Sequence, residues 1–204
     1  MIAVNLEKCH GCGICTRACP VGILQLEAGM PVMIRSLRRM CIRCGHCVAA
    51  CPSGALSLPD MASEECAIID RMLLPDAEQT KMLCMSRRSI RLFRNTPVDR
   101  DVLRDLIVTA GYAPSGKNWQ PLSWTLVYDQ GKVAGISSLA VEWMRERVAA
   151  DDPMARMMYF KGVLSAWERG YDQIMRGAPH AVVVHAPAGT PAGAATAACA
   201  LSYL

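Results

Sequence analysis

Two runs of cysteine residues constrain this chain more than any other feature. Each run has the spacing C-x2-C-x2-C-x3-C and is followed by proline, over residues 9–20 and again over 41–52. In such a run, three thiolates from one tight loop converge on a cubane iron–sulfur cluster, and the fourth cysteine, beside proline, serves a second cluster. The sequence therefore predicts two [4Fe–4S] clusters, the first held by Cys9, Cys12, Cys15 and Cys51, and the second by Cys41, Cys44, Cys47 and Cys19.

Two other uses of cysteine compete with this interpretation. Zinc takes four ligands, typically from two separated C-x2-C pairs, which leaves no role for a third cysteine and a Cys-Pro pair in each run. A disulfide framework requires an oxidising compartment, and the N-terminus lacks the basic region and long apolar stretch of a secretory signal. We therefore expect cluster ligands in a cytoplasmic protein. His10 and His46 are not expected to be ligands, because eight thiolates suffice.

Composition limits the class of protein. The chain has 204 residues, of which 52% are hydrophobic and 20% charged, so it can bury a core and is not intrinsically disordered. The net charge of +4 is too small to indicate a nucleic-acid-binding protein. The uncharged stretch 177–204 is broken by proline and glycine, so we expect no membrane span.

The order of motifs predicts the domains. Residues 1–58, which contain both cysteine runs, resemble a bacterial-type two-cluster ferredoxin domain, and the resemblance implies an internal repeat of short hairpins and helical turns. Residues 59–75 form a connecting segment, in which 64–73 have the apolar pattern of a short amphipathic helix that docks one domain on the other. Residues 76–204 form an α+β domain.

Periodicity and capping residues predict the elements of this second domain. The Met-rich stretch at 154–158 is expected to pack in apolar surroundings, and so are Cys66, Cys84 and Cys199. His180 and His185 flank a strand and are expected to be satisfied core or edge side chains. We predict helices over 76–86, 102–110, 132–149 and 153–176, strands over 122–128 and 181–185 (the latter buried), and an Ala-rich helix after Thr190.

A basic motif follows the first of these helices. It contains Arg87, Arg88, Ser89 and Arg91, whose guanidiniums and hydroxyl are suited to hold a phosphate group. A charged helix end facing solvent is the alternative interpretation.

A polar loop between a helix and a strand forms the second motif. It runs from Ala113 to Pro121, and its amide and hydroxyl groups are suited to hydrogen-bond a heteroaromatic ring. The alternative is a helix-to-strand connection that is merely rich in turn formers.

Together the two motifs resemble those of the nitroreductase family of FMN-dependent oxidoreductases, R-[RH]-S-x-[RK] and P-S-x-x-N-x-Q-P. The resemblance implies a nitroreductase-like α+β sandwich. It also implies further elements beyond the Ala-rich helix, so we expect the sandwich to be incomplete and the sequence to be a fragment. By the resemblance, the FMN phosphate and ribityl chain contact Arg87, Arg88, Ser89 and Arg91, the ribityl and isoalloxazine groups face Ser115, Asn118 and Gln120, and Pro114 and Gly116 shape the loop.

The two resemblances imply an iron–sulfur flavoprotein oxidoreductase. Electrons from a low-potential donor, ferredoxin-like or NAD(P)H-linked, pass through two [4Fe–4S] clusters to FMN and on to a nitro compound, quinone or activated alkene. The nitroreductase resemblance also implies a homodimer. No catalytic side chain is assigned, because the flavin carries the chemistry. The alternative function is a ferredoxin-type electron carrier or redox sensor whose second domain is not catalytic.

Overall fold

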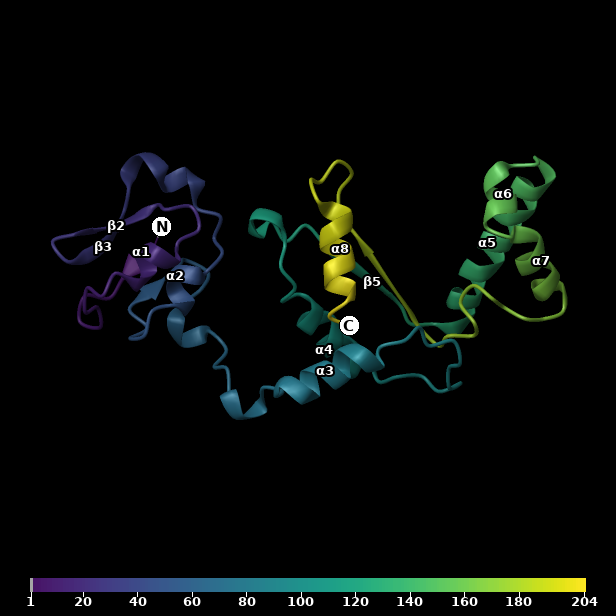
Figure 1. The fold of residues 1–204 in the computed structure, drawn as a ribbon, viewed down its shortest axis with the longest axis horizontal. Coiled ribbons are helices and arrows are strands. Elements are labelled where there is room, and N and C mark those ends of the chain that lie inside the picture. Colours follow the sequence, from purple (N-terminus) through teal and green to yellow (C-terminus); the bar gives the residue numbers. More distant parts are fainter. Residues whose placement is uncertain (1) are drawn as a thin grey trace. The chain divides into compact units, whose positions relative to one another are not determined.

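The computed structural model describes residues 2–204 as an α+β chain divided into two units. The first unit extends to Lys81 and also includes the short segment Ser115–Gln120. The second unit comprises Met82–Pro114 and Pro121–Leu204. Figure 1 shows both units, with colours that follow the sequence from the N-terminus to the C-terminus.

The first unit consists of short strands and short helices. Two antiparallel strand pairs, β1 with β4 and β2 with β3, frame helices α1 and α2. Each helix follows a glycine with positive φ, 70° at Gly13 and 72° at Gly45, so the two cysteine runs fold alike. The expected repeat is therefore confirmed for the helical turns, whereas the strands do not repeat in the same way: β2 and β3 form a hairpin, and β1 and β4 pair from opposite ends of the unit. The elements are β1 Ala3–Val4, α1 Ile14–Ala18, β2 Leu24–Glu27, β3 Met30–Met33, the 3-10 helix η1 Arg35–Met40, α2 His46–Ala49 and β4 Leu56–Ser57.

A small apolar core supports this unit. Ile23, Leu24 and Leu56 are buried in it, and the side chains of Leu37 and Met33 pack against it. Several of the cysteines also border the core, so apolar packing and the cysteine loops depend on each other. Its buried members are Cys15, Ile23, Leu24, Val48, Leu56 and Leu58.

The connecting segment differs from the prediction. The expected helix over 64–73 is absent from the described chain, which has only the 3-10 turns η2 Ser63–Glu65 and η3 Arg71–Leu73 there. The side chain of Ile68 is 95% exposed and that of Met72 89%. An apolar pattern forms a helix only when a partner surface covers it, and neither side chain is covered in this unit.

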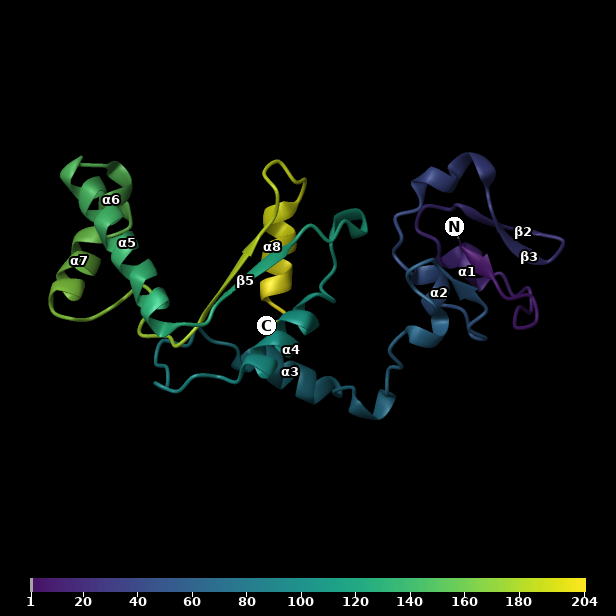
Figure 2. The same ribbon diagram turned by 180° about the vertical axis from the view of Figure 1, so that it is seen from behind.

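The second unit is mainly helical. In both views α5, α6 and α7 lie side by side (Figure 1, Figure 2), and Trp143 of α5 meets Phe160 of α7 edge to face at 5.4 Å between ring centroids. The elements after the connecting segment are α3 Ala77–Ser86, α4 Arg100–Ala110, η4 Gly116–Asn118, β5 Ser123–Val127, α5 Gln130–Ala149, α6 Pro153–Met157, α7 Phe160–Glu168, β6 Ala181–His185 and α8 Gly193–Leu201.

Local signals located most of these elements. The backbone amide of Asp76 donates to Gln79, and that of Gln79 donates back to the Asp76 carboxylate, a reciprocal cap that starts α3.

The prediction of a single helix over 153–176 is wrong. It is interrupted at Tyr159, whose φ is 57°, and it ends at Glu168. A left-handed residue cannot continue an α-helix, so α6 and α7 are separate.

Strands β5 and β6 pair antiparallel, with Thr125 opposite Val183. Strand β6 was expected to be buried, but the side chain of Val183 is 45% exposed. The reason is that the described residues form only a two-stranded sheet here, which cannot cover both of its faces. His180 satisfies the expectation of an engaged side chain, because its Nε2 accepts from the Val98 amide at 2.8 Å.

Several expected burials are also corrected. The Met-rich stretch lies largely outside the core, with Met157 78% exposed. Cys66 and Cys84 are exposed, and Cys199 is half-buried. The side chains of these residues are apolar, but the described residues do not pack closely enough around them to bury them. Among residues 2–204, no helix is both long and apolar enough to cross a bilayer.

Candidate functional site

The cysteines of the first predicted cluster line one cavity in the first unit. Its wall includes the thiols of the loop around α1 and Cys51, which arrives from the second run. The backbone amide of Ala55 donates to Cys51 Sγ at 3.2 Å, which restrains this thiol at the cavity. The four cysteines that line it are Cys9, Cys12, Cys15 and Cys51.

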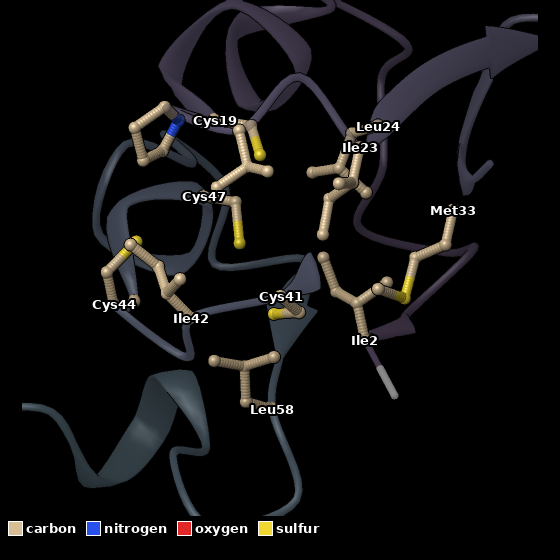
Figure 3. Close-up of a pocket in the computed structure, with 13 residues that line it drawn as sticks. Ile2, Cys19, Ile23, Leu24, Met33, Cys41, Ile42, Cys44, Cys47 and Leu58 are labelled. Atoms are coloured by element: carbon tan, nitrogen blue, oxygen red, sulfur yellow. The ribbon is translucent and has the colours of Figure 1, made fainter. Parts of the chain in front are cut away.

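The cysteines of the second predicted cluster line another cavity (Figure 3). Three come from the second run, and the fourth, Cys19, comes from the end of α1. Apolar side chains such as Ile23, Leu24 and Leu58 complete the wall and limit the access of water. The four cysteines of this cavity are Cys19, Cys41, Cys44 and Cys47.

Both lining sets match the sets that the spacing predicts, three thiols from one run and one from the other. Among the described residues, no three Cys, His, Asp or Glu side chains are placed to hold a single metal ion. Four soft thiol donors around a cavity with an apolar wall suit an iron–sulfur cluster. The donor set therefore fits the expected group at both places.

Burial influences these thiols. It raises the pKa of Cys15 and of Cys47, since a buried thiolate loses its hydration. The pKa of Cys51 is lowered in spite of its partial burial, because the Ala55 amide and the Ser53 hydroxyl stabilise the thiolate. A cluster bound at these cavities would have to displace protons from the buried thiols.

Two ion pairs tie the connecting segment to the cysteine loops. Lys8, next to Cys9, contacts Glu64 with Nζ and Oε1 2.8 Å apart, and this pair lowers the pKa of Glu64 to about 2. Arg43, between Cys41 and Cys44, pairs with Asp60 and lowers the pKa of that carboxyl. Both pairs are exposed, so they orient the chain more than they stabilise it.

The basic motif lies in the second unit, directly after α3. Its predicted members Arg87, Arg88, Ser89 and Arg91 are all exposed. The Arg87 guanidinium donates to the Ser202 carbonyl at 2.6 Å, and the guanidiniums of Arg88 and Arg91 donate to nearby backbone carbonyls. Three exposed guanidiniums beside a hydroxyl fit a phosphate chemically, since they can exchange carbonyl partners for phosphate oxygens.

The polar loop is divided between the units. Pro114 belongs to the second unit, and Ser115–Gln120 to the first. Ser115 Oγ accepts from the Gln120 amide at 3.0 Å and closes the loop. The Asn118 side-chain amide donates to the carbonyls of Ile42 and Arg43, at 3.2 and 3.0 Å.

The backbone of this loop is unusual. Positive φ values of 51°, 55° and 47° occur at Lys117, Asn118 and Gln120. Such values are rare outside glycine and mark conformations that the surroundings impose. The loop therefore has a constrained backbone, in which the Ser115 hydroxyl and the Asn118 amide already have partners in the protein.

The motif search missed one charged feature near the second cavity. Three exposed arginines, Arg35, Arg38 and Arg39, lie in η1, just before Cys41. The net charge of the chain does not indicate them, whereas a count of charges by segment would have found them.

Comparisons with known proteins match both parts of the chain. A family model described as "Nitroreductase family" matches residues 84–204, and one described as "4Fe-4S dicluster domain" matches residues 8–56. This is the fused architecture that the sequence motifs predict.

Individual relatives match over part of their length. Nitroreductase NfnB of Mycolicibacterium smegmatis is 33% identical over 88 residues, which are 43% of this chain and 37% of NfnB. A nitroreductase with bound FMN from Bacteroides fragilis aligns at 22% identity and a TM-score of 0.41, over 61% of each chain. NfnB from Mycobacterium smegmatis in complex with NADPH aligns at 21% identity and a TM-score of 0.40, over 62% of this chain and 68% of that one. The alignment with the curated NfnB therefore spans less than half of that relative.

Proposed function

Because the chain belongs to the nitroreductase family and carries a 4Fe-4S dicluster domain before the family domain, we propose that it is an iron–sulfur flavoprotein oxidoreductase. Electrons from a low-potential donor enter two [4Fe–4S] clusters, pass to FMN and leave to a small acceptor such as a nitro compound, quinone or activated alkene. Residues 1–58 carry the clusters, 59–75 connect, and 76–204 carry the flavin-binding part.

One observation carries this proposal: two separate cavities are each lined by four cysteines, three from one run and one from the other. The crossed arrangement is the one that two-cluster ferredoxin spacing requires. A two-cluster domain fused to a reductase domain supplies single electrons to FMN, which can accept two of them.

The flavin-contacting residues follow from the two motifs. We assign phosphate and ribityl contacts to Arg87, Arg88, Ser89 and Arg91, and ring and ribityl contacts to the loop 114–120. When bound, FMN supplies the hydride or single-electron chemistry. The arginines neutralise its phosphate, and the loop residues Ser115, Asn118 and Gln120 orient it, with Pro114 and Gly116 shaping the backbone.

The cellular setting follows from the cofactors. Cluster thiolates persist in a reducing compartment, which supports a cytoplasmic location. We propose that the donor is a ferredoxin-like carrier or an NAD(P)H-linked reductase. In line with the resemblance to nitroreductases, we propose a homodimer as the working form.

The first experiment measures iron, acid-labile sulfide and FMN per chain after anaerobic purification. Two four-iron clusters and one flavin correspond to about eight irons and one FMN. Iron without FMN would contradict the reductase and leave a carrier. Neither iron nor FMN would contradict the whole proposal.

The second experiment removes one cluster at a time. Cys12→Ser and Cys44→Ser should each abolish FMN reduction by a one-electron donor, while FMN reduced by a hydride donor still reduces the acceptor. Cys66→Ser is the matched control, because Cys66 lies outside both cavities and its thiol only donates to the Ala62 carbonyl. Survival of one-electron delivery in both cluster variants would contradict the relay.

The alternative, an electron carrier or redox sensor with a non-catalytic second domain, is favoured by one observation. The side chains of Arg87 and Asn118 already have partners in the protein, the carbonyls of Ser202, Ile42 and Arg43. The double variant Arg87→Ala, Arg91→Ala separates the two functions. Loss of FMN and turnover, with Arg145→Ala unaffected, supports the enzyme, whereas unchanged electron transfer without flavin supports the carrier.

A further inference from the structure

An exposed basic surface adjoins the second cysteine cavity. We define the arginine patch as Arg35, Arg38 and Arg39, which lie in the 3-10 helix η1. Leu37 of the same helix packs against the apolar core. This anchor holds the helix to the unit while the three arginines stay exposed.

The segment that contains the patch has an excess of positive charge. Six basic residues and only two acidic ones fall within positions 1–58, so this segment has a net charge of +4, equal to that of the whole chain. No salt bridge within residues 2–204 involves an arginine of the patch, and the neighbouring Arg43 is the one that pairs with Asp60. The positive potential of the patch is therefore not cancelled by near carboxylates.

The patch is directly connected to a cluster ligand. The Cys41 amide donates to the Arg38 carbonyl at 3.4 Å. Arg38, Arg43 and Cys41 also line a common cavity of about 270 Å³, which opens beside the second cysteine set. A partner that sits on the arginines thus comes close to a thiol of the second predicted cluster.

We propose that the arginine patch docks an acidic one-electron carrier protein, which reduces the second cluster. In the step, one electron moves from the reduced carrier to the cluster, so the carrier is oxidised by one electron and the cluster is reduced by one, with no bond formed or broken. The inference rests on the proposed function and names its donor class and its entry point.

Charge and position together favour this partner. Transient electron-transfer complexes bury little surface and rely on complementary charge for fast encounter and release. Three unpaired arginines provide such attraction over a short segment. Because the arginines lie beside Cys41, a redox protein that docks on them comes within reach of the second predicted cluster. Binding of a nucleic acid or an anionic membrane would make no use of this position.

The test uses a plant-type [2Fe–2S] ferredoxin with an acidic surface as the probe. Stopped-flow absorbance follows cluster reduction in the purified chain, at low and at high salt. The triple variant Arg35→Gln, Arg38→Gln, Arg39→Gln should lower the second-order rate at low salt by about tenfold or more, and it should flatten the salt dependence. The matched control, Lys132→Gln, Arg145→Gln, Lys161→Gln, makes the same change of charge at exposed positions in the second unit and should retain the rate.

Two further measurements show whether a slower rate results from lost docking. Reduction by the methyl viologen radical cation should be no slower in the patch variant than in the other two proteins, because the arginines do not attract a small cation. The variant should keep its cluster content and its cluster EPR spectrum, which excludes misfolding as the cause of a slower rate.

Several outcomes overturn the inference. These are an equal ferredoxin rate in the patch variant, an equal loss in the control, or patch-dependent binding of duplex DNA or anionic vesicles without any effect on the ferredoxin rate. If clusters are present and respond to methyl viologen, such an outcome refutes only the docking surface. If clusters are absent, or if reduced clusters never reduce FMN, the proposed function itself fails.

Discussion

Replacing Gly11 by alanine should loosen the first cluster site. Gly11 lies between Cys9 and Cys12 with a φ of +64°, and a Cβ placed on it would be 2.5 Å from the carbonyl oxygen of Gly29. That oxygen belongs to the backbone of the turn between β2 and β3, so it cannot move aside as the end of a side chain would. The cysteine loop or the hairpin must shift.

A matched control separates the steric cost of Gly11→Ala from the backbone cost of placing any side chain at a positive φ. Gly22 has a φ of +67°, and a Cβ there would have nothing within 4 Å. Gly22→Ala therefore incurs only the left-handed backbone cost, about 1–2 kcal/mol. Gly11→Ala incurs the same cost and an overpacking cost of about 1–3 kcal/mol. If the loop opens before the cluster is lost, the extra term corresponds to a loss rate roughly 5- to 150-fold faster.

The assay follows the visible absorbance of the clusters during anaerobic incubation with an iron chelator. EPR of the reduced protein identifies which cluster disappears. The expected order of loss rates is Gly11→Ala far above Gly22→Ala, and Gly22→Ala modestly above the parent protein, with the first cluster lost first in Gly11→Ala. Equal rates for the two variants, or earlier loss of the second cluster, would refute the steric argument.

Two other perturbations test the structure away from the cluster cavities. Ser137 is fully buried and donates to Asp172 at 2.8 Å, so Ser137→Ala should lower the free energy of unfolding by about 1.5–3 kcal/mol, the range for hydrogen bonds to charged groups. Ser138→Ala is the control and should change it by less than about 0.5 kcal/mol in the same urea titration followed by tryptophan fluorescence; equal effects would contradict this role of the buried bond. The Glu64 carboxyl should titrate near a pKa of about 2 by NMR, below the usual 4.5, since Lys8 stabilises the carboxylate. Its contribution to stability is thus present above pH 4.5 and is lost as the pH falls toward 2; Lys8→Gln should move the midpoint up, and an unmoved midpoint would show that another group is responsible.

Local signals in the sequence were enough for the features that depend on near neighbours along the chain. The cysteine spacing predicts which loops form, because two-residue gaps allow only tight turns. The cap between Asp76 and Gln79 predicts the start of α3, since both partners lie within one helical turn. The fused ferredoxin and nitroreductase architecture is likewise carried by short motifs, and the family models confirm it.

Features that depend on distant parts of the chain were decided only by the tertiary structure. The apolar pattern at 64–73 and the Met-rich stretch indicate faces that need a partner, but a pattern does not say whether a partner surface is there, and Ile68 and Met157 are exposed. The arginine patch is a mixed case. Its place just before Cys41 can be read from the sequence, whereas the anchoring of η1 by Leu37 and the cavity that Arg38 shares with Cys41 are found only in the tertiary structure. Periodicity and spacing depend on residues that are near one another in the sequence. Burial and proximity depend on contacts between segments that are far apart in the chain.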